Sequence, residues 1–423
     1  MHLEQLQSGL ESGALRGRME EIYAADAPAQ ERRLLELANT FAEIFPDERE
    51  VSAFSAPGRS EIGGNHTDHN NGKVLAASIN LDIQAVAAKT GGGRILLKSA
   101  HYPFNNVGLD VLTPMDAEYG HSNAMIRGIC AGFMQRGHKV GGFSAATVSD
   151  VLGGSGLSSS AAFEVLVCTV LNHFYNDGKI GPLEIAQISQ YAENVFVGKP
   201  SGLLDQTACA VGGFVSIDFE DTKAPVVRPI AFDFESSGYA LCILDTGGSH
   251  ADLTDDYAAV RAEMENVAGA LGKRVLRETD REALLQYLPV VREAAGERAV
   301  LRALHFFAEN DRVDAQAAAL ERGDFPAFLA LIKESGRSSF MYNQNVFTPR
   351  RREQPVALAL ALSETLLGAR GAWRVHGGGF AGTIQAFVPL DLLEGYRKAM
   401  EAVFGKGSCY VLRVRPHGGV KVL

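Results

Sequence analysis

The stretch that most constrains this 423-residue chain is Leu152–Ala162, which reads LGGSGLSSSAA. The segment Phe143–Val148 before it has the composition of a β-strand, and the apolar run after it favours a helix. A strand, a glycine-rich loop and a helix that begins at serines together present several backbone N–H groups to a phosphate. We therefore predict that this loop binds the phosphate chain of a nucleotide.

The loop fits neither of the two common nucleotide-binding motifs. A P-loop has a lysine and then a serine or threonine after its last glycine, whereas Leu157 and Ser158 stand there. The dinucleotide motif has a third glycine where this chain has Ser159. Taken alone, the loop is equally compatible with an ordinary glycine turn whose serines cap a helix.

Composition limits the class of protein. The length predicts two domains, and we place their boundary near residue 235, where the composition turns helical. A hydrophobic content of 46% and a charged content of 21% are typical of a globular enzyme. The net charge of -10 argues against a nucleic-acid partner. The five cysteines form no CxxC pair, and no run of about 18 apolar residues occurs, so we expect a cytoplasmic protein without a membrane span.

Periodicity and breaker residues predict the main elements. We expect two helices within residues 1–45 and a short strand, Val51–Ala56, that ends at Pro57. Further helices are expected over 182–197, 254–271 and 291–310. The alternation along Phe380–Val388 predicts a half-buried strand.

Two polar segments offer candidate functional groups. The segment Gly58–Gly72, GRSEIGGNHTDHNNG, mixes donors and acceptors in a way that suits a polyol better than zinc, and a capped turn is the alternative. Asp205 follows a glycine-punctuated loop; it is either a solvated acid or a group that engages a hydroxyl, provided that a cation such as Arg59 keeps it ionised. Glu193 is either an exposed helix charge or an oxygen ligand for Mg²⁺.

Four motifs, in order, resemble those of the GHMP small-molecule kinases and, within them, the galactokinase family. They are PGRSEIGGNHTDHNNGKVLAASI, GSGLSSSAAFE, AENVFVGKPSGLLDQ and RVHGGGFAGT, and the resemblance runs from about Ala53 to the C-terminus. It implies an α/β (α+β) fold of two domains, 26–235 and 236–423, with the active site in the cleft between them. Residues 1–25 are then an N-terminal extension, which we expect to be helical.

The resemblance also implies a role for each matching residue. Asp205 would engage the anomeric hydroxyl of a sugar, and Arg59 would stabilise both Asp205 and the phosphoryl group in transfer. The residues implied to line the sugar site are Asn65, His66, Asp68, Gly202 and Tyr257. Those implied to hold the triphosphate of ATP are Gly153, Gly154, Ser155, Gly156, Leu157, Ser158 and Ser159. The implied ligands of Mg²⁺ are Ser160 and Glu193.

The chain departs from the family pattern at the sugar end. Asn65 stands where the family usually has glutamate, and His69 stands where it usually has tyrosine. A carboxylate only accepts hydrogen bonds, whereas an amide also donates them. The implied activity is phosphorylation of galactose at its anomeric hydroxyl. The alternatives are a related kinase for another sugar and a non-catalytic sensor of sugar and ATP. Arg59, Asp205, Ser160 and Glu193 together favour a kinase, and the sequence is compatible with a monomer.

Overall fold

The structure is a computed structural model that describes residues 1–423 except 152–155, 200, 249–252 and 349–351. It divides into two compact units. Unit 1 comprises residues 1–59, 78–213 and 415–423, and unit 2 comprises residues 60–77 and 214–414. The two units are interleaved along the chain, whereas the sequence predicted consecutive domains that meet at residue 235.

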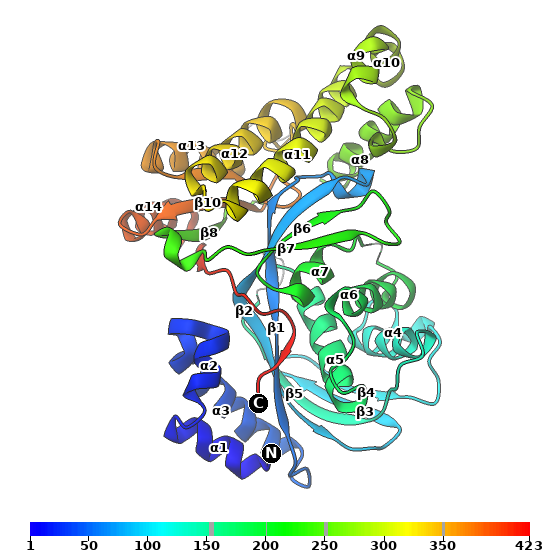
Figure 1. The fold of residues 1–423 in the computed structure, drawn as a ribbon, viewed down its shortest axis with the longest axis vertical. Coiled ribbons are helices and arrows are strands. Elements are labelled where there is room, and N and C mark those ends of the chain that lie inside the picture. The colour runs from blue at the N-terminus through cyan, green and yellow to red at the C-terminus, as the bar shows by residue number, and fades with distance from the viewer. Residues whose placement is uncertain (152–155, 200, 249–252, 349–351) are drawn as a thin grey trace. The chain divides into compact units, whose positions relative to one another are not determined.

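Unit 1 combines a sheet with helices on both of its faces. The helices are α1 (Leu3–Ser12), α2 (Arg16–Tyr23), α3 (Ala27–Ile44), α4 (Ser122–Gln135), α5 (Ser159–Tyr175), α6 (Pro182–Tyr191) and α7 (Leu204–Val211). The strands are β1 (Ser52–Gly63), β2 (Lys73–Lys89), β3 (Arg94–Ser99), β4 (Phe104–Gly108), β5 (Phe143–Ser149) and β12 (Val420–Lys421), of which β1 and β2 continue into unit 2. They lie in the order β12-β1-β2-β5-β3-β4, with β3 parallel to β5. Helices α1–α3 lie on one side of these strands and α4–α7 on the other (Figure 1).

The N-terminal helices are an integral layer of unit 1. Leu3, Leu6 and Leu10 of α1 are buried in one hydrophobic cluster with residues of α3, β1 and β5. Gly13 ends α1 in the left-handed conformation (φ 72°), so the predicted first helix becomes the two helices α1 and α2. The expectation that residues 1–25 are helical is correct for α1 and α2, and both helices pack on α3.

A buried ion-pair network ties distant parts of unit 1 together. Asp82 of β2 is fully buried and accepts hydrogen bonds from Arg33 Nη1 (2.5 Å), Tyr23 Oη (2.7 Å) and Arg415 Nη1 (3.0 Å). Burial raises the pKa of Asp82, but the charges of Arg33 and Arg415 outweigh that effect and hold its pKa below the ordinary value. One carboxylate therefore joins α2, α3, β2 and the C-terminal segment.

Strand β1 does not end at Pro57, as the sequence predicted, but continues to Gly63. The strand passes close to the glycine-rich loop, because the backbone N–H of Arg59 donates to the carbonyl of Leu157 (3.0 Å). A Cβ atom at Gly58 would lie 2.7 Å from that same carbonyl oxygen, so only glycine fits there without a shift. This pairing with the loop supports the strand across the proline.

Unit 2 combines a second sheet with a helical layer. Its helices are α8 (Thr254–Ala270), α9 (Arg281–Gln286), α10 (Leu288–Ala295), α11 (Glu297–Glu321), α12 (Phe325–Ser338), α13 (Pro355–Leu367) and α14 (Leu393–Phe404). Its strands are β6 (Phe214–Asp218), β7 (Val226–Ile230), β8 (Tyr239–Asp245), β9 (Ala372–Val375), β10 (Thr383–Pro389) and β11 (Cys409–Leu412). Strand β6 pairs with Lys73–Ala77 of β2, and β7 pairs with β6.

The antiparallel sheet of unit 2 has the order β11-β8-β10-β9. Ile384, Ala386 and Val388 of β10 pack in one hydrophobic cluster with α13 and α14. On the opposite face, the ring of Phe387 contacts Phe328 of α12 at a centroid distance of 5.3 Å. The predicted half-buried strand is therefore wrong in its burial, because helices cover both faces of β10.

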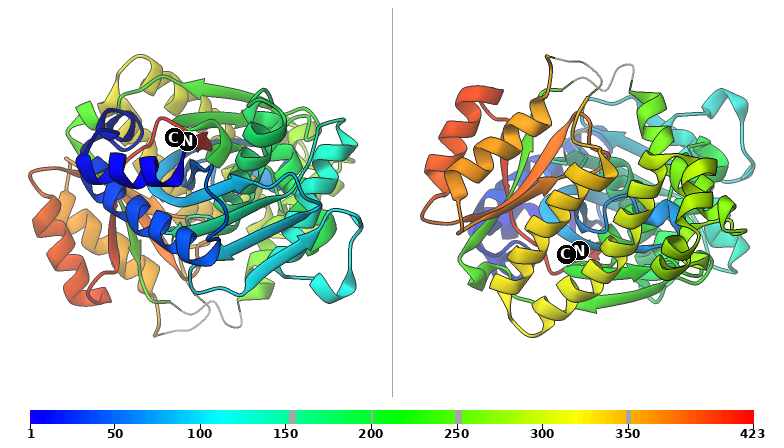
Figure 2. Two further views of the ribbon diagram at one scale, coloured as in Figure 1. Left: turned by 90° about the horizontal axis from the view of Figure 1, so that it is seen from below. Right: turned by 90° about the horizontal axis from the view of Figure 1, so that it is seen from above.

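Two predicted helices have different bounds. The helix expected over 182–197 is α-helical to Tyr191 and then π-helical over Ala192–Val197. The helix expected over 291–310 is replaced by α10 and the longer α11, which are separated by Gly296 in a left-handed conformation (φ 88°). Helix α11 lies beside α12 (Figure 2). Across the described residues, none of the helices is both long and apolar enough to cross a membrane.

Replacing Leu6 by alanine tests whether α1 belongs to the core of unit 1. Leu6 is fully buried, so Leu6→Ala should lower the free energy of unfolding by about 2–5 kcal/mol. Urea unfolding measures the change, and Glu4→Ala on the exposed face of α1 is the control, which should stay near the wild-type value. Equal stability of the two variants would show that α1 adds nothing to the core.

Candidate active site

Asp205 lies at the start of α7 in unit 1 and is held by two neighbours. Arg59 donates to Asp205 Oδ1 from Nε (2.7 Å) and from Nη2 (2.6 Å). The hydroxyl of Ser158 donates to the other oxygen, Oδ2. The side chain of Arg59 is 13% exposed and that of Asp205 is 35% exposed, so the carboxylate is anchored yet still reachable from solvent.

The surroundings of Asp205 favour its ionised form. Burial raises its pKa, but the charge of Arg59, the hydrogen bonds from Ser158 and Arg59, and the charge of Lys199 together lower that pKa below the ordinary value. A lowered pKa keeps the group negatively charged at neutral pH and makes it a weak base. The structure thus unites Arg59 with Asp205, as the family resemblance implied.

The described part of the glycine-rich loop lies against the same pair. Arg59 Nη1 donates to the carbonyl of Gly156 (2.5 Å), so one guanidinium joins the loop to Asp205. Ser158 has left-handed backbone angles (φ 62°), which are unusual for a residue with a side chain and are typical of functional turns. Helix α5 begins at the next residue, Ser159, and its N-terminus is an electrostatically favourable place for a phosphate. Gly153, Gly154 and Ser155 lie outside the described residues.

A second group of charges surrounds Glu193 in the π-helical segment. Glu193 is 2% exposed and accepts hydrogen bonds from Lys199 Nζ (2.7 Å) and from Gln206 Nε2 (2.9 Å). Gln206 Nε2 also donates to Glu164 of α5 (3.1 Å), which is fully buried. Burial and the charge of Glu193 raise the pKa of Glu164 well above its ordinary value.

Sequence reasoning missed three members of this group, namely Lys199, Gln206 and Glu164. Glu164 had a usable signal, because it is an acid within the otherwise apolar stretch that forms the buried face of α5. Gln206 directly follows Asp205, but adjacency alone gives no sign of a bridge between two carboxylates. Glu193 itself is buried, which removes the interpretation as an exposed helix charge.

The residues near Glu193 suit a hard divalent cation. Within the described part of the chain, no cluster of three or more histidine, cysteine or acidic side chains could hold a metal by itself. Mg²⁺ needs no such cluster, since it usually combines one or two carboxylates with substrate phosphates and water. Glu193 is a buried carboxylate whose charge partner, Lys199, has a 63% exposed side chain. Ser160 is exposed in the first turn of α5 and offers a hydroxyl oxygen.

In unit 2, three of the predicted sugar-site residues bind consecutive carbonyls of one glycine segment. Asn65 Nδ2 donates to Gly377 O (2.8 Å). His66 Nε2 lies 2.9 Å from Gly378 O, which makes this nitrogen the protonated one. Tyr257 Oη donates to Gly379 O (2.9 Å). The signature segment and the third glycine motif thus form one hydrogen-bonded unit.

Asn65 is fully buried, and its side-chain amide is engaged on both ends. Besides its bond to Gly377, Nδ2 donates to Glu61 Oε1 (3.1 Å). Its oxygen accepts from Asn345 Nδ2 (2.9 Å) and from Ser339 Oγ (3.3 Å). The amide therefore acts both as a donor and as an acceptor. An ionised glutamate only accepts, so it could not make the same hydrogen bonds.

The other predicted residues of the sugar end are placed as follows. His66 has left-handed backbone angles (φ 60°), and the half-buried Asp68 begins a short 3₁₀ turn. His69 is half-buried at the centre of that turn, where partial burial and the charge of His66 lower its pKa well below the ordinary value. Gly202 is exposed in unit 1, three residues before Asp205. His376 is buried and contacts Ser60 and Thr383.

Comparisons with known proteins place the chain in a family. Residues 124–213 match the GHMP kinases N terminal domain, and residues 39–89 match the galactokinase galactose-binding signature. A galactokinase of Streptomyces coelicolor is 32% identical over 377 residues, which cover 88% of this chain and 94% of that protein. The chain belongs to the galactokinase family. A galactokinase of Mycobacterium tuberculosis is 34% identical over 347 residues, or 80% of this chain and 89% of the relative.

Solved structures support the same membership. Lactococcus lactis galactokinase complexed with galactose superposes with a TM-score of 0.76 at 26% identity, covering 90% of this chain and 98% of that one. A mevalonate kinase superposes with a TM-score of 0.61 at 15% identity, over 86% of this chain and 99% of that one, which is a likeness of fold alone. The predicted α/β fold of the GHMP kinases is confirmed, and the galactokinase family is a family of phosphotransferases.

Removing the charge of Arg59 should shift the pH dependence of activity. Arg59 lowers the pKa of Asp205, so in Arg59→Gln that pKa rises and the carboxylate is protonated at a higher pH. The acid limb of the kcat/KM profile should move up by about 1–3 pH units. Arg94→Gln, at the exposed first residue of β3, is the control and should leave the limb in place. An unmoved limb in Arg59→Gln would contradict the role assigned to this ion pair.

Replacing Asn65 by aspartate tests whether its amide donates inside unit 2. The new carboxylate would face Glu61 and Gly377 O without a proton to donate, so Asn65→Asp should lose about 2–4 kcal/mol of unfolding free energy near neutral pH. The loss should be smaller at about pH 5 than at about pH 8, because a buried acid with a raised pKa takes up a proton as pH falls. Asn106→Asp, at an exposed position that only accepts from Arg94, is the control in urea unfolding.

Proposed function

We propose that this protein transfers the terminal phosphoryl group of ATP to the anomeric hydroxyl of D-galactose, giving ADP and galactose 1-phosphate. The observation that carries the proposal is the ionised Asp205, which Arg59 holds beside the glycine-rich loop. An ionised acid and a cation at a helix N-terminus are the groups that orient a hydroxyl and balance the charge of a phosphate. Membership of the galactokinase family supports galactose as the substrate.

In this proposal Asp205 orients the nucleophile. Its carboxylate accepts a hydrogen bond from the anomeric hydroxyl and so directs the hydroxyl oxygen at the phosphoryl group. Because its pKa is lowered, Asp205 contributes orientation and charge more than basicity. Arg59 balances the charge of Asp205 and of the phosphoryl group, and the backbone N–H groups of Gly156, Leu157, Ser158 and Ser159 bind the triphosphate, together with Gly153, Gly154 and Ser155.

Ser160 and Glu193 are the proposed ligands of Mg²⁺, which would neutralise phosphate charge when bound. Lys199 then balances Glu193 when the cation is absent, and Gln206 fixes the direction of the carboxylate. At the sugar end we assign contacts to His66, Asp68, Gly202 and Tyr257. Asn65 is fully buried, so we assign it a supporting role: its side-chain amide donates to the carbonyl of Gly377 and holds the glycine segment in place.

The second candidate is a kinase for another sugar, and a specific observation favours it. Asn65 is engaged on every side by unit 2, so it leaves the sugar without the carboxylate that the family usually presents at this position. Partial burial and the charge of His66 lower the pKa of His69, so this ring is neutral near neutral pH. These two positions are where a preference for a different hydroxyl pattern would arise.

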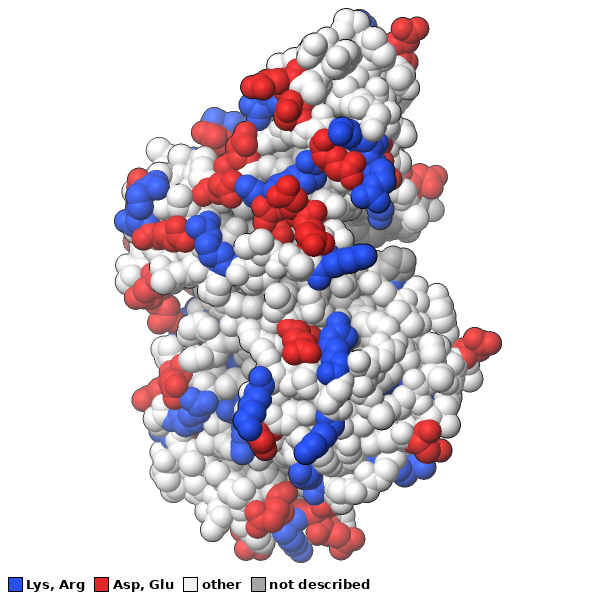
Figure 3. Space-filling model, turned by 45° about the vertical axis from the view of Figure 1, so that its right-hand side comes forward, with Lys and Arg blue, Asp and Glu red and all other residues white. Residues whose placement is uncertain are grey.

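Surface charge and the state of the cysteines bear on the binding partner and the cellular compartment of the protein. On the face shown in Figure 3, basic side chains alternate with acidic ones, and the net charge of the chain is -10, so we assign a small-molecule partner and no nucleic acid. All five cysteines are free and buried, which supports the proposed reducing compartment, the cytoplasm.

A coupled assay of ADP release over a panel of hexoses, pentoses and amino sugars tests the proposal. Galactose should give the highest kcat/KM, and omission of Mg²⁺ should abolish turnover. Asp205→Asn keeps the size of the side chain but removes its charge, so it should lower kcat at least about a hundredfold while ATP binding, measured by calorimetry, stays near wild type. Asp218→Asn, on β6, is the matched control. Tight ATP binding without turnover of any sugar would leave only the sensor.

A further inference from the structure

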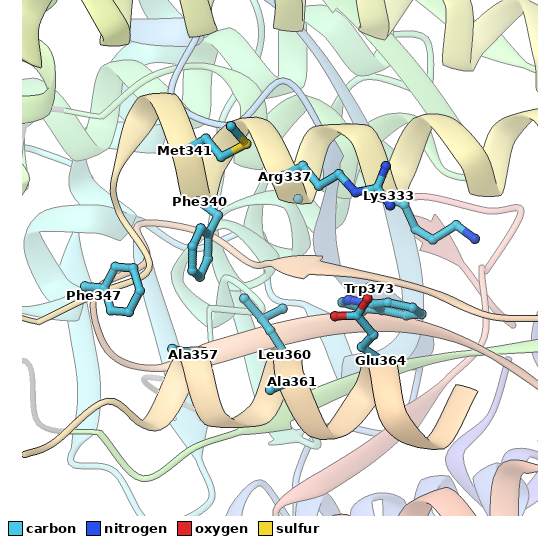
Figure 4. A pocket seen from close by; sticks show the side chains of 11 residues that line it. Lys333, Arg337, Phe340, Met341, Phe347, Ala357, Leu360, Ala361, Glu364 and Trp373 are labelled. Carbon is cyan, nitrogen blue, oxygen red and sulfur yellow. The ribbon is translucent and has the colours of Figure 1, made fainter. Parts of the chain in front are cut away.

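A groove in unit 2 contains none of the residues assigned above. It lies between α12 and α13, has a volume of about 550 Å³ and is drawn in Figure 4. Both helices pack on strand β9, yet over the described residues they make little contact with each other. Sites for small molecules usually measure about 300–1,000 Å³, so the groove is large enough for one.

Small residues keep the space between the helices open. A Cβ atom at Gly336 would lie 2.8 Å from the carbonyl oxygen of Trp373, so α12 approaches β9 closely at this one glycine. Across the groove, α13 presents Ala357 and Ala361, which lie one helical turn apart. Figure 4 labels both alanines on the side of α13 that lines the groove.

The walls are apolar and partly open to solvent. Leu360 and Trp373 form the inner surface, and Phe340, Met341 and Phe347 form one end (Figure 4). These last three side chains are 42%, 57% and 44% exposed, which is unusual for large apolar residues gathered in one place. Such a surface favours a ligand with a flat or flexible hydrocarbon body. The groove walls offer too few polar groups to bind the hydroxyls of a sugar.

The charge on the groove is positive. Lys333 and Arg337 lie four residues apart on α12, and Glu364 on α13 is the single acid among the lining residues. The ammonium of Lys333 lies 5.9 Å from the centre of the Trp373 ring. Within the described chain, neither cation has an ion pair or a side-chain hydrogen bond, whereas most arginines of unit 2 are paired with acids. Two unpaired cations beside an apolar trough complement an anion with an apolar body.

We propose that this groove binds a small amphipathic carboxylate, with its aromatic or short acyl body along Trp373 and Leu360 and its charge at Lys333 and Arg337. The site is separate from the proposed kinase reaction and does not depend on which sugar is phosphorylated.

Trp373 is the single tryptophan of the chain, so its fluorescence reports directly on the groove. Phenylbutyrate is the probe, and phenylbutanol, which has the same body without the charge, is its control. Titration of the full-length protein with phenylbutyrate should change the fluorescence of Trp373 saturably, and phenylbutanol should bind at least about fivefold more weakly. Absence of a saturable change, or equal affinity for the two compounds, would overturn the proposal.

Two variants and a matched control locate the binding. Arg337→Gln should weaken phenylbutyrate roughly fivefold and leave phenylbutanol unchanged. Ala361→Phe places a ring in the groove at an exposed position and should abolish binding of both compounds. Leu366→Phe adds a ring at an exposed position of the same helix outside the groove and should bind like wild type. Unchanged binding of phenylbutyrate to Ala361→Phe would contradict the proposal. A Trp373 fluorescence that varies with protein concentration would also contradict it, because a second copy of the chain would then cover the groove.

Sugar phosphorylation provides the independent reference. Ala361→Phe should phosphorylate its sugar at the wild-type rate, which shows that the variant is folded. If no sugar is phosphorylated but phenylbutyrate still binds as described, the proposed reaction fails and the groove proposal stands. If phosphorylation proceeds and phenylbutyrate does not bind, only the groove proposal fails.

Discussion

The contact of Arg59 with both Asp205 and the carbonyl of Gly156 is the interaction on which the arrangement in unit 1 depends. It fixes the start of α7 relative to the start of α5. It also keeps an acid ionised at a place where burial alone would favour protonation. Without this guanidinium, Asp205, Glu193 and Glu164 would form a cluster of acids balanced among the described residues by Lys199 alone. A divalent cation such as Mg²⁺ is therefore electrostatically favoured beside Glu193.

In unit 2, the corresponding interaction is the set of side-chain hydrogen bonds that holds the glycine segment Gly377–Gly379. Gly377 and Gly379 have left-handed backbone angles, and three side chains bind the carbonyls of Gly377, Gly378 and Gly379 in succession. Asn65 supports this arrangement from a buried position, and the ring of His305 binds the carbonyl of Asn65 (2.9 Å). Burial lowers the pKa of His305 to about 4, so this ring is neutral over the physiological range. The sugar signature is thus rigid because its side chains bond to backbone, and not because the chain there is regular.

Much of the fold followed from the sequence, and the exceptions have identifiable causes. The strand Phe143–Ser149 and helix α8 were predicted within one or two residues because their apolar periodicity is strong. Strand β1 was predicted too short because Pro57 suggested an end, and its support by the backbone of Leu157 comes from a residue far along the chain. The burial of β10 on both faces was missed for the same reason, since the second covering helix is set by tertiary packing.

Some contacts of the candidate site could also be predicted from the sequence, and others could not. The family resemblance paired Arg59 with Asp205, whereas the residues alone left Arg59 as one candidate cation, and the structure pairs the two. The bridge from Gln206 to Glu193 and Glu164 could not be predicted, because it needs the turn that brings α7 back against α5. Asn65 could be recognised as a departure from the family, but only its neighbours Glu61, Ser339 and Asn345 show that an amide is required there.

The last nine residues have a consequence for how the chain is made. Strand β12 pairs with β1, and Arg415 binds Asp82 and Ser55, so residues from the two ends of the sequence complete the same sheet and the same charge network. During translation, the first 213 residues leave the ribosome with Asp82 lacking one of its two arginines and with one edge of β1 unpaired. Unit 1 therefore reaches its final form only after unit 2 has been synthesised. A folding delay of this kind exposes a strand edge for tens of seconds at typical rates of synthesis, which are about 5–20 residues per second.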